Sequence, residues 1–129
     1  MKDYVKQVLR TESTPSMAVL SRLTKQVRVV HAIMGLTTEV GELADALKKH
    51  VFYNAPLDAD NIKEEAGDIL WYLALLLDCL GLGSFDPVME ANIAKLRTRY
   101  PSKFTEDAAM NRDPDAEMKA MIEETLERR

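Results

Sequence analysis

The sequence predicts an all-α protein with a four-helix-bundle-like core and extra N- and C-terminal helices. Along most of its 129 residues, apolar side chains recur at spacings of three and four, and no segment shows the two-residue alternation of a strand. The run Ile69–Leu77 is apolar on every helical face, so the helix around it is expected to be buried. An apolar content of 47% and a charged content of 29% fit one ordinary globular domain.

The N-terminal half is expected to form three helices. The first covers residues 3–12, and the second starts at Thr14–Pro15, where a hydroxyl N-cap precedes proline, and runs to Met34. Gly35 either interrupts the helix there or permits close packing, and the sequence leaves both alternatives open. A third helix should run from Leu36 to about Lys49, with a buried stripe made of Leu36, Val40, Leu43 and Leu47.

The C-terminal half begins with a loop over Val51–Asp60 and a central helix over residues 61–80, which Gly81 and Gly83 terminate. A further helix should start at Asp86–Pro87 and end by Tyr100, because Pro101 follows. Residues 102–112 are expected to be extended or irregular. A last helix opens at Asp113–Pro114, with an apolar face of Met118, Met121, Ile122 and Leu126.

Two pairs of acidic residues flank the central loop. Glu65 and Asp68 share one face of the central helix with Tyr72, in the middle of apolar residues. Two carboxylates on an apolar face cost several kcal/mol unless something compensates them. Glu39 and Glu42 point in directions about 60° apart on the preceding helix and can converge on one point.

An antiparallel hairpin of these two helices would bring the four carboxylates of Glu39, Glu42, Glu65 and Asp68 together, where they repel one another unless cations hold them. Oxygen-only ligands favour Mg²⁺, with Mn²⁺ as an alternative, over zinc or a di-iron centre. The opposing interpretations are salt bridges from Glu65 and Asp68 to a neighbouring helix and a solvated edge carrying Glu39 and Glu42.

A third group of polar residues lies on the helix that ends at Tyr100. Asn92, Lys95 and Arg99 share an arc of about 60°, opposite a packing side formed by Met89, Ile93 and Leu96. An amide and two cations in line are suited to binding a phosphate chain beside a metal. An ordinary basic surface is the alternative.

Three segments, GLTTEVGELADALKK, KEEAGDILWYLALLLDCLGL and NIAKLRTRYPSKF, resemble the MazG-like family of all-α nucleoside triphosphate pyrophosphohydrolases over residues 28–112. The resemblance implies a MazG-like domain over residues 1–112 and a C-terminal helical extension over residues 113–129. Thr38 stands where longer versions of the family motif often have a glutamate.

The resemblance also implies a catalytic site. Its catalytic metal ligands would be Glu39, Glu42, Glu65 and Asp68, and its substrate-binding residues Tyr72, Asn92, Lys95 and Arg99. The implied reaction converts a (deoxy)nucleoside triphosphate and water to the monophosphate and pyrophosphate, with Mg²⁺, in a homodimer or homotetramer. A non-catalytic nucleotide-binding or helical interaction module is the alternative from another functional class.

Several partners and locations are disfavoured. The net charge of −4 argues against binding long nucleic acid, and the single cysteine, Cys79, excludes a disulfide within the chain and fits a reducing compartment. The N-terminal segment lacks the apolar run of a signal peptide, and the apolar run of the central helix is too short to cross a bilayer. We therefore expect a soluble, cytoplasmic protein.

Overall fold

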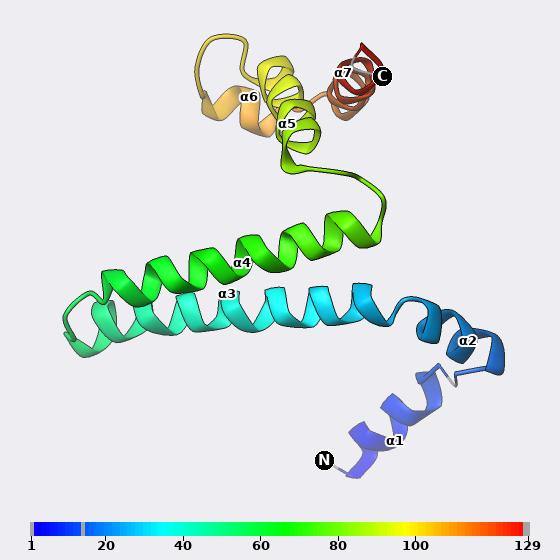
Figure 1. Cartoon of the computed structure of the whole chain (residues 1–129). Helices are drawn as coiled ribbons and strands as arrows, with labels where there is room; N and C mark the ends of the chain where they lie inside the picture. Colours follow the sequence, from blue (N-terminus) through cyan, green and yellow to red (C-terminus); the bar gives the residue numbers. More distant parts are fainter. Residues whose placement is uncertain (1, 14, 128–129) are drawn as a thin grey trace.

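The computed structural model describes residues 2–13 and 15–127, and within them every regular element is a helix. The all-α class predicted from the sequence is confirmed. In chain order the helices are α1 (Lys2–Thr11), α2 (Met17–Lys25), α3 (Val27–Tyr53), α4 (Ala59–Cys79), α5 (Phe85–Arg99), α6 (Glu106–Met110) and α7 (Pro114–Glu127) (Figure 1).

The two longest helices, α3 and α4, form an antiparallel hairpin (Figure 1). Helix α3 ends at Asn54, which takes the left-handed conformation with φ 55° and donates its backbone N–H to the Lys49 carbonyl oxygen. Asp58 caps α4 by accepting a hydrogen bond from the backbone N–H of Asn61. The loop is thus shorter than the predicted 51–60, because α3 continues for one turn beyond Lys49.

Gly35 neither breaks nor bends the helix into two segments, since α3 runs without interruption from Val27 to Tyr53. The interruption of the helix lies instead at Gln26, between α2 and α3. Gly35 is buried, and a β-carbon there would overlap the ring of Tyr72 on α4. Close packing is therefore the alternative that the structure supports at this glycine.

The start of α2 differs from the prediction as well. The predicted N-cap, Thr14, lies outside the described residues, and the helix begins at Met17 with Ser16 as its N-cap. The Ser16 hydroxyl accepts a hydrogen bond from the backbone N–H of Val19 at 3.3 Å.

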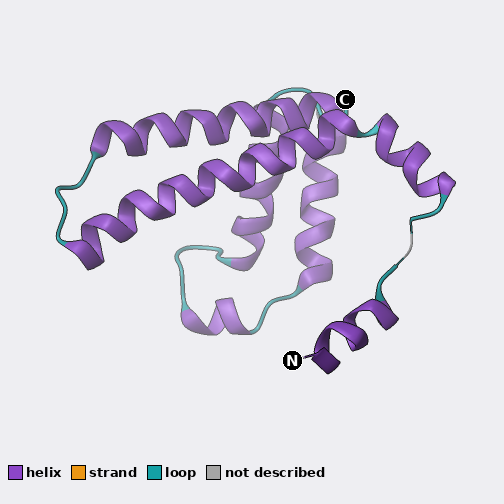
Figure 2. Ribbon diagram, turned by 90° about the horizontal axis from the view of Figure 1, so that it is seen from below, coloured by secondary structure: helices purple, strands orange, loops and turns teal. Residues whose placement is uncertain are grey.

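The C-terminal helices form a second packed pair, α5 with α7, which lies apart from the α3–α4 hairpin in Figure 1 and overlaps it in the view from below in Figure 2. Gly81 and Gly83 both have positive φ, 65° and 76°, and terminate α4 as the sequence predicts. The segment 102–112, expected to be irregular, contains the short helix α6, which Thr105 caps by accepting from the backbone N–H of Ala108.

Little of the apolar surface is buried within one chain. Among the described residues the buried hydrophobic side chains are Ala32, Leu77 and Ala91. The central helix, predicted to be buried all round, leaves Leu70 and Trp71 more than half exposed. The stripe predicted on α3 is also only partly covered, since Val40 and Leu47 are exposed. The burial prediction is wrong for the isolated chain because α3 and α4 pack mainly against each other, which leaves their remaining faces uncovered.

The described part of the chain contains no helix with the length and apolar character needed to cross a bilayer.

Candidate metal centre

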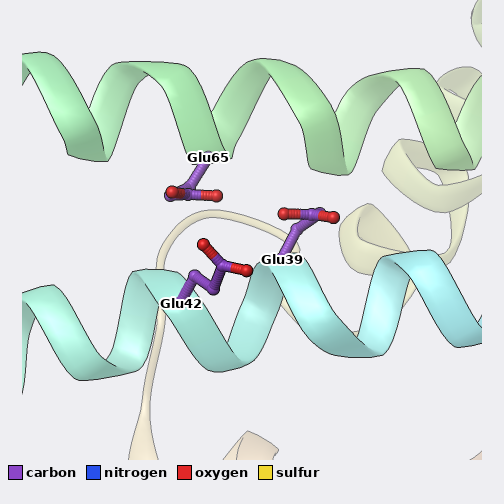
Figure 3. Close-up of side chains that lie close together, drawn as sticks. All are labelled: Glu39, Glu42 and Glu65. Carbon is purple, nitrogen blue, oxygen red and sulfur yellow. The ribbon is translucent and has the colours of Figure 1, made fainter.

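Three glutamates converge in the space between α3 and α4. Glu39 and Glu42 come from adjacent turns of α3, Glu65 comes from α4, and all three carboxylates point into the gap between the helices (Figure 3). One oxygen of each lies within 4.8 Å of an oxygen of the other two. The three-residue spacing on α3 is what directs both of its carboxylates to the same side.

The cluster has a gradient of burial. Glu65 is only 4% exposed, Glu39 is half-buried and Glu42 is exposed. Burial raises the pKa of the Glu39 carboxyl, and the neighbouring Glu42 and Glu65 carboxylates raise it further, against a hydrogen bond from Thr38 that lowers it. Like charges therefore meet here in a partly desolvated place, which is the electrostatic setting that a cation relieves.

Asp68, the fourth predicted ligand, lies one turn beyond Glu65 on α4 and is exposed. It does not belong to the group of carboxylates that converge in the described residues.

Tyr72, one further turn along α4, lies over Gly35 and forms part of an aromatic cluster. Its ring makes edge-on contacts with His31 of α3, at 5.7 Å between ring centroids, and with Trp71, at 4.9 Å. Trp71 remains 57% exposed.

An open polar hollow of about 470 Å³ adjoins the glutamates, on the side of the α3–α4 loop. Its lining includes Asp45, Lys49 and Asn61, none of which belongs to the set of site residues predicted from the sequence. Lys48 and Lys49 both pair with Asp45 and lower its pKa to about 2. Asp45 is thus a neutralised neighbour of the cluster, and the i, i+3 and i, i+4 spacings to the lysines were a signal for this pairing.

The basic residues of α5 are placed differently from the prediction. Val88 and Ala91 line an apolar hollow with Met121 and Thr125 of α7, while Met89 and Ile93 are exposed. The packing side predicted for this helix is therefore wrong for Met89 and Ile93, whereas Leu96 is half-buried. Because Ala91, Lys95 and Arg99 follow at four-residue intervals, the face with the two cations is turned toward α7.

Arg99 binds Glu117 of α7 through two hydrogen bonds, Nε to Oε1 at 2.8 Å and Nη2 to Oε2 at 2.6 Å. Arg112 donates to the same carboxylate at 3.3 and 2.9 Å. Glu117 is 3% exposed, and the hydrogen bonds from Arg99 and Arg112 lower its pKa to about 2. No helical spacing in the sequence marked Glu117, because its partners lie outside α7, Arg99 on α5 and Arg112 in the segment before α7.

Of the predicted site residues, the structure thus brings together Glu39, Glu42 and Glu65. Asp68 and Tyr72 follow on successive turns of α4, and Asn92, Lys95 and Arg99 lie on α5, which belongs to the other packed pair. The oxygen-only donor set of the three glutamates fits a hard divalent cation such as Mg²⁺ or Mn²⁺ and lacks the sulfur or nitrogen ligands typical of zinc.

The fold and the glutamate cluster define an all-α protein with a carboxylate site between two antiparallel helices. Residues 30–104 match the model of the MazG nucleotide pyrophosphohydrolase domain. The chain belongs to this family. Searches of curated proteins and of solved structures gave no significant match.

Proposed function

We propose that this protein is a Mg²⁺-dependent nucleoside triphosphate pyrophosphohydrolase, which converts a (deoxy)nucleoside triphosphate and water to the monophosphate and pyrophosphate. The observation that carries the proposal is the convergence of Glu39, Glu42 and Glu65 inside a nucleotide pyrophosphohydrolase domain. Carboxylates that repel one another in a half-buried gap have a physical reason to be there if they bind a cation.

In this proposal the three glutamates hold the cation, and Asp68 joins them from the next turn of α4. Bound Mg²⁺ would neutralise charge on the phosphates and lower the pKa of a water molecule. Mn²⁺ should substitute for it, because the donor oxygens suit both ions.

The substrate-binding part of the proposal assigns Tyr72 to the nucleoside end and Asn92, Lys95 and Arg99 to the phosphate chain. Helix α5 packs with α7 and not along the glutamates. The α5 side chains would therefore reach the site through a rearrangement or from a second copy of the chain. The exposed apolar side chains of α3 and α4 support a homodimer or homotetramer, since one chain buries so few of them.

Hydrolysis in ¹⁸O-labelled water, followed by mass spectrometry of the products, tests the reaction. Attack on the α-phosphate places the label in the nucleoside monophosphate and leaves the pyrophosphate unlabelled. Release of orthophosphate and a nucleoside diphosphate would refute the proposed reaction. Label in the pyrophosphate would show that water attacks the β-phosphate, and it would refute the assignment of the α-phosphate as the attacked group.

The alternative is a nucleotide-binding or regulatory module without turnover. Two observations favour it: Thr38 at the position of a frequent family glutamate, and Arg99, whose guanidinium is engaged by Glu117. This alternative predicts that calorimetry detects binding of Mn²⁺ and of a triphosphate. It also predicts that no pyrophosphate is released from any triphosphate in a panel of canonical and modified substrates.

A further inference from the structure

The most buried carboxylate of the cluster is held by an amide on its own helix. Asn61 Nδ2 donates a hydrogen bond to Glu65 Oε1 at 2.8 Å, and both side chains are at least half-buried. Both also line the polar hollow beside the cluster. The residues are four apart on α4, so the amide lies directly one turn below the carboxylate.

The start of α4 fixes the position of this amide. The Asn61 backbone N–H donates to Asp58 Oδ1 at 3.0 Å, and the Ile62 N–H donates to the Asp58 carbonyl oxygen at 3.1 Å. Capping of this kind determines where the first helical turn begins. The Asp58 cap therefore sets the place of Asn61, and Asn61 in turn restrains Glu65.

The hydrogen bond restricts rotation of the Glu65 carboxylate, which would otherwise turn away from the like charges of Glu39 and Glu42. With Oε1 held by the Asn61 amide, Oε2 is the oxygen of Glu65 that is left to bind a cation. Groups that orient metal-binding side chains in this way typically change metal affinity when they are removed.

We propose that Asn61 is a positioning residue for the metal centre, which fixes Glu65 so that its carboxylate faces Glu39 and Glu42. This inference rests on the proposed function, because it concerns the same cation site. Asn61 does not touch the reacting atoms; it acts through Glu65.

The test is Mn²⁺ binding to the full-length chain, measured by calorimetry in the absence of nucleotide. Asn61→Leu keeps the approximate size of the side chain and removes the donor, whereas Asn61→Gln keeps an amide donor on a longer stem. We expect Asn61→Leu to weaken Mn²⁺ binding by about 10- to 100-fold, and Asn61→Gln to remain much closer to the original protein.

A matched control is available at the C-terminal end of α6, where Asn111 is the C-cap residue. Asn111 Nδ2 donates to Asp107 Oδ1 at 2.7 Å with the same four-residue spacing, but at an exposed place on a different element. Asn111→Leu should leave Mn²⁺ affinity unchanged. An equal loss in Asn61→Leu and Asn111→Leu would overturn the proposal, because the loss would then reflect general destabilisation. If Asn61→Leu does not fold, Asn61→Ser, whose hydroxyl is too short to reach Glu65, takes its place.

Glu65→Gln separates this inference from the proposed function. If Glu65→Gln abolishes Mn²⁺ binding and Asn61→Leu binds like the original protein, the positioning role of Asn61 is wrong and the metal centre stands. If Glu65→Gln binds Mn²⁺ normally, the metal centre itself is wrong, and the role of Asn61 is refuted with it. Loss in both variants, with recovery in Asn61→Gln, supports both.

Discussion

Replacing Gly35 with alanine tests whether the α3–α4 hairpin depends on the close approach of Tyr72 to the α3 backbone. Gly35 is buried, and an added β-carbon would overlap the body of the Tyr72 ring rather than the end of a flexible side chain. Either the ring or the helix must move. Gly41 is a matched control in the same helix, because it is exposed and no atom outside the helix's own backbone and chain neighbours lies within 4 Å of a β-carbon there.

The two substitutions share one effect and differ in another. Each gains about 1 kcal/mol of helix stability, because alanine has a higher helix propensity than glycine. Only Gly35→Ala adds overpacking, which costs about 1–3 kcal/mol. We therefore expect Gly41→Ala to stabilise the protein by about 1 kcal/mol and Gly35→Ala to fall below it by about 1–3 kcal/mol. At about 4 °C per kcal/mol for a chain of this size, the melting temperatures should differ by about 4–12 °C.

Urea and thermal unfolding of both variants, without metal, measure this difference. The cost of Gly35→Ala should also vanish in a Tyr72→Ala background, since the group that it overlaps is then absent. Equal stabilisation by Gly35→Ala and Gly41→Ala would refute the reasoning, because Tyr72 could not then lie against Gly35 in solution.

Three further predictions concern charged residues. The Glu117 pKa is lowered from 4.5 to about 2, so its ion pairs should stabilise the fold above about pH 4.5, and this contribution should disappear as the pH falls toward 2. In urea unfolding measured across this pH range, the free energy of unfolding of Glu117→Gln should lack this decrease. Glu42→Gln or Asp68→Asn should remove Mn²⁺ binding and activity while the metal-free protein melts at an equal or higher temperature, and normal Mn²⁺ affinity in both would contradict the ligand assignment. Lys95→Ala and Arg99→Ala should each lower kcat/KM by about 10- to 100-fold without weakening Mn²⁺ binding in the absence of nucleotide. Of the two, only Arg99→Ala should also lower the melting temperature, because it leaves buried Glu117 with one partner fewer. Unchanged kinetics in both variants would make α5 an ordinary basic surface.

The helical class, the helix ends and the directions of neighbouring side chains could be predicted from the sequence, because they depend on residues close together along the chain. Helical periodicity predicted the class, and Gly81 and Gly83 marked the end of α4. The three-residue spacing of Glu39 and Glu42 predicted that their carboxylates point the same way, and a short loop predicted the hairpin that brings Glu65 opposite them.

Tertiary structure decided the features that depend on which helices meet. Gly35 was compatible with a break or with close packing until Tyr72 was found against it. The apolar run of α4 predicted complete burial, but the exposure of a helix depends on how many other helices pack around it. Within one chain, α3 is the one long helix that packs against α4 among the described residues. Arg99 was a candidate phosphate ligand by its position on α5, yet its strongest contact is with Glu117, 18 residues later, because α7 folds back onto α5. Periodicity reports the face on which a side chain lies, whereas the partner of that face is set by long-range packing.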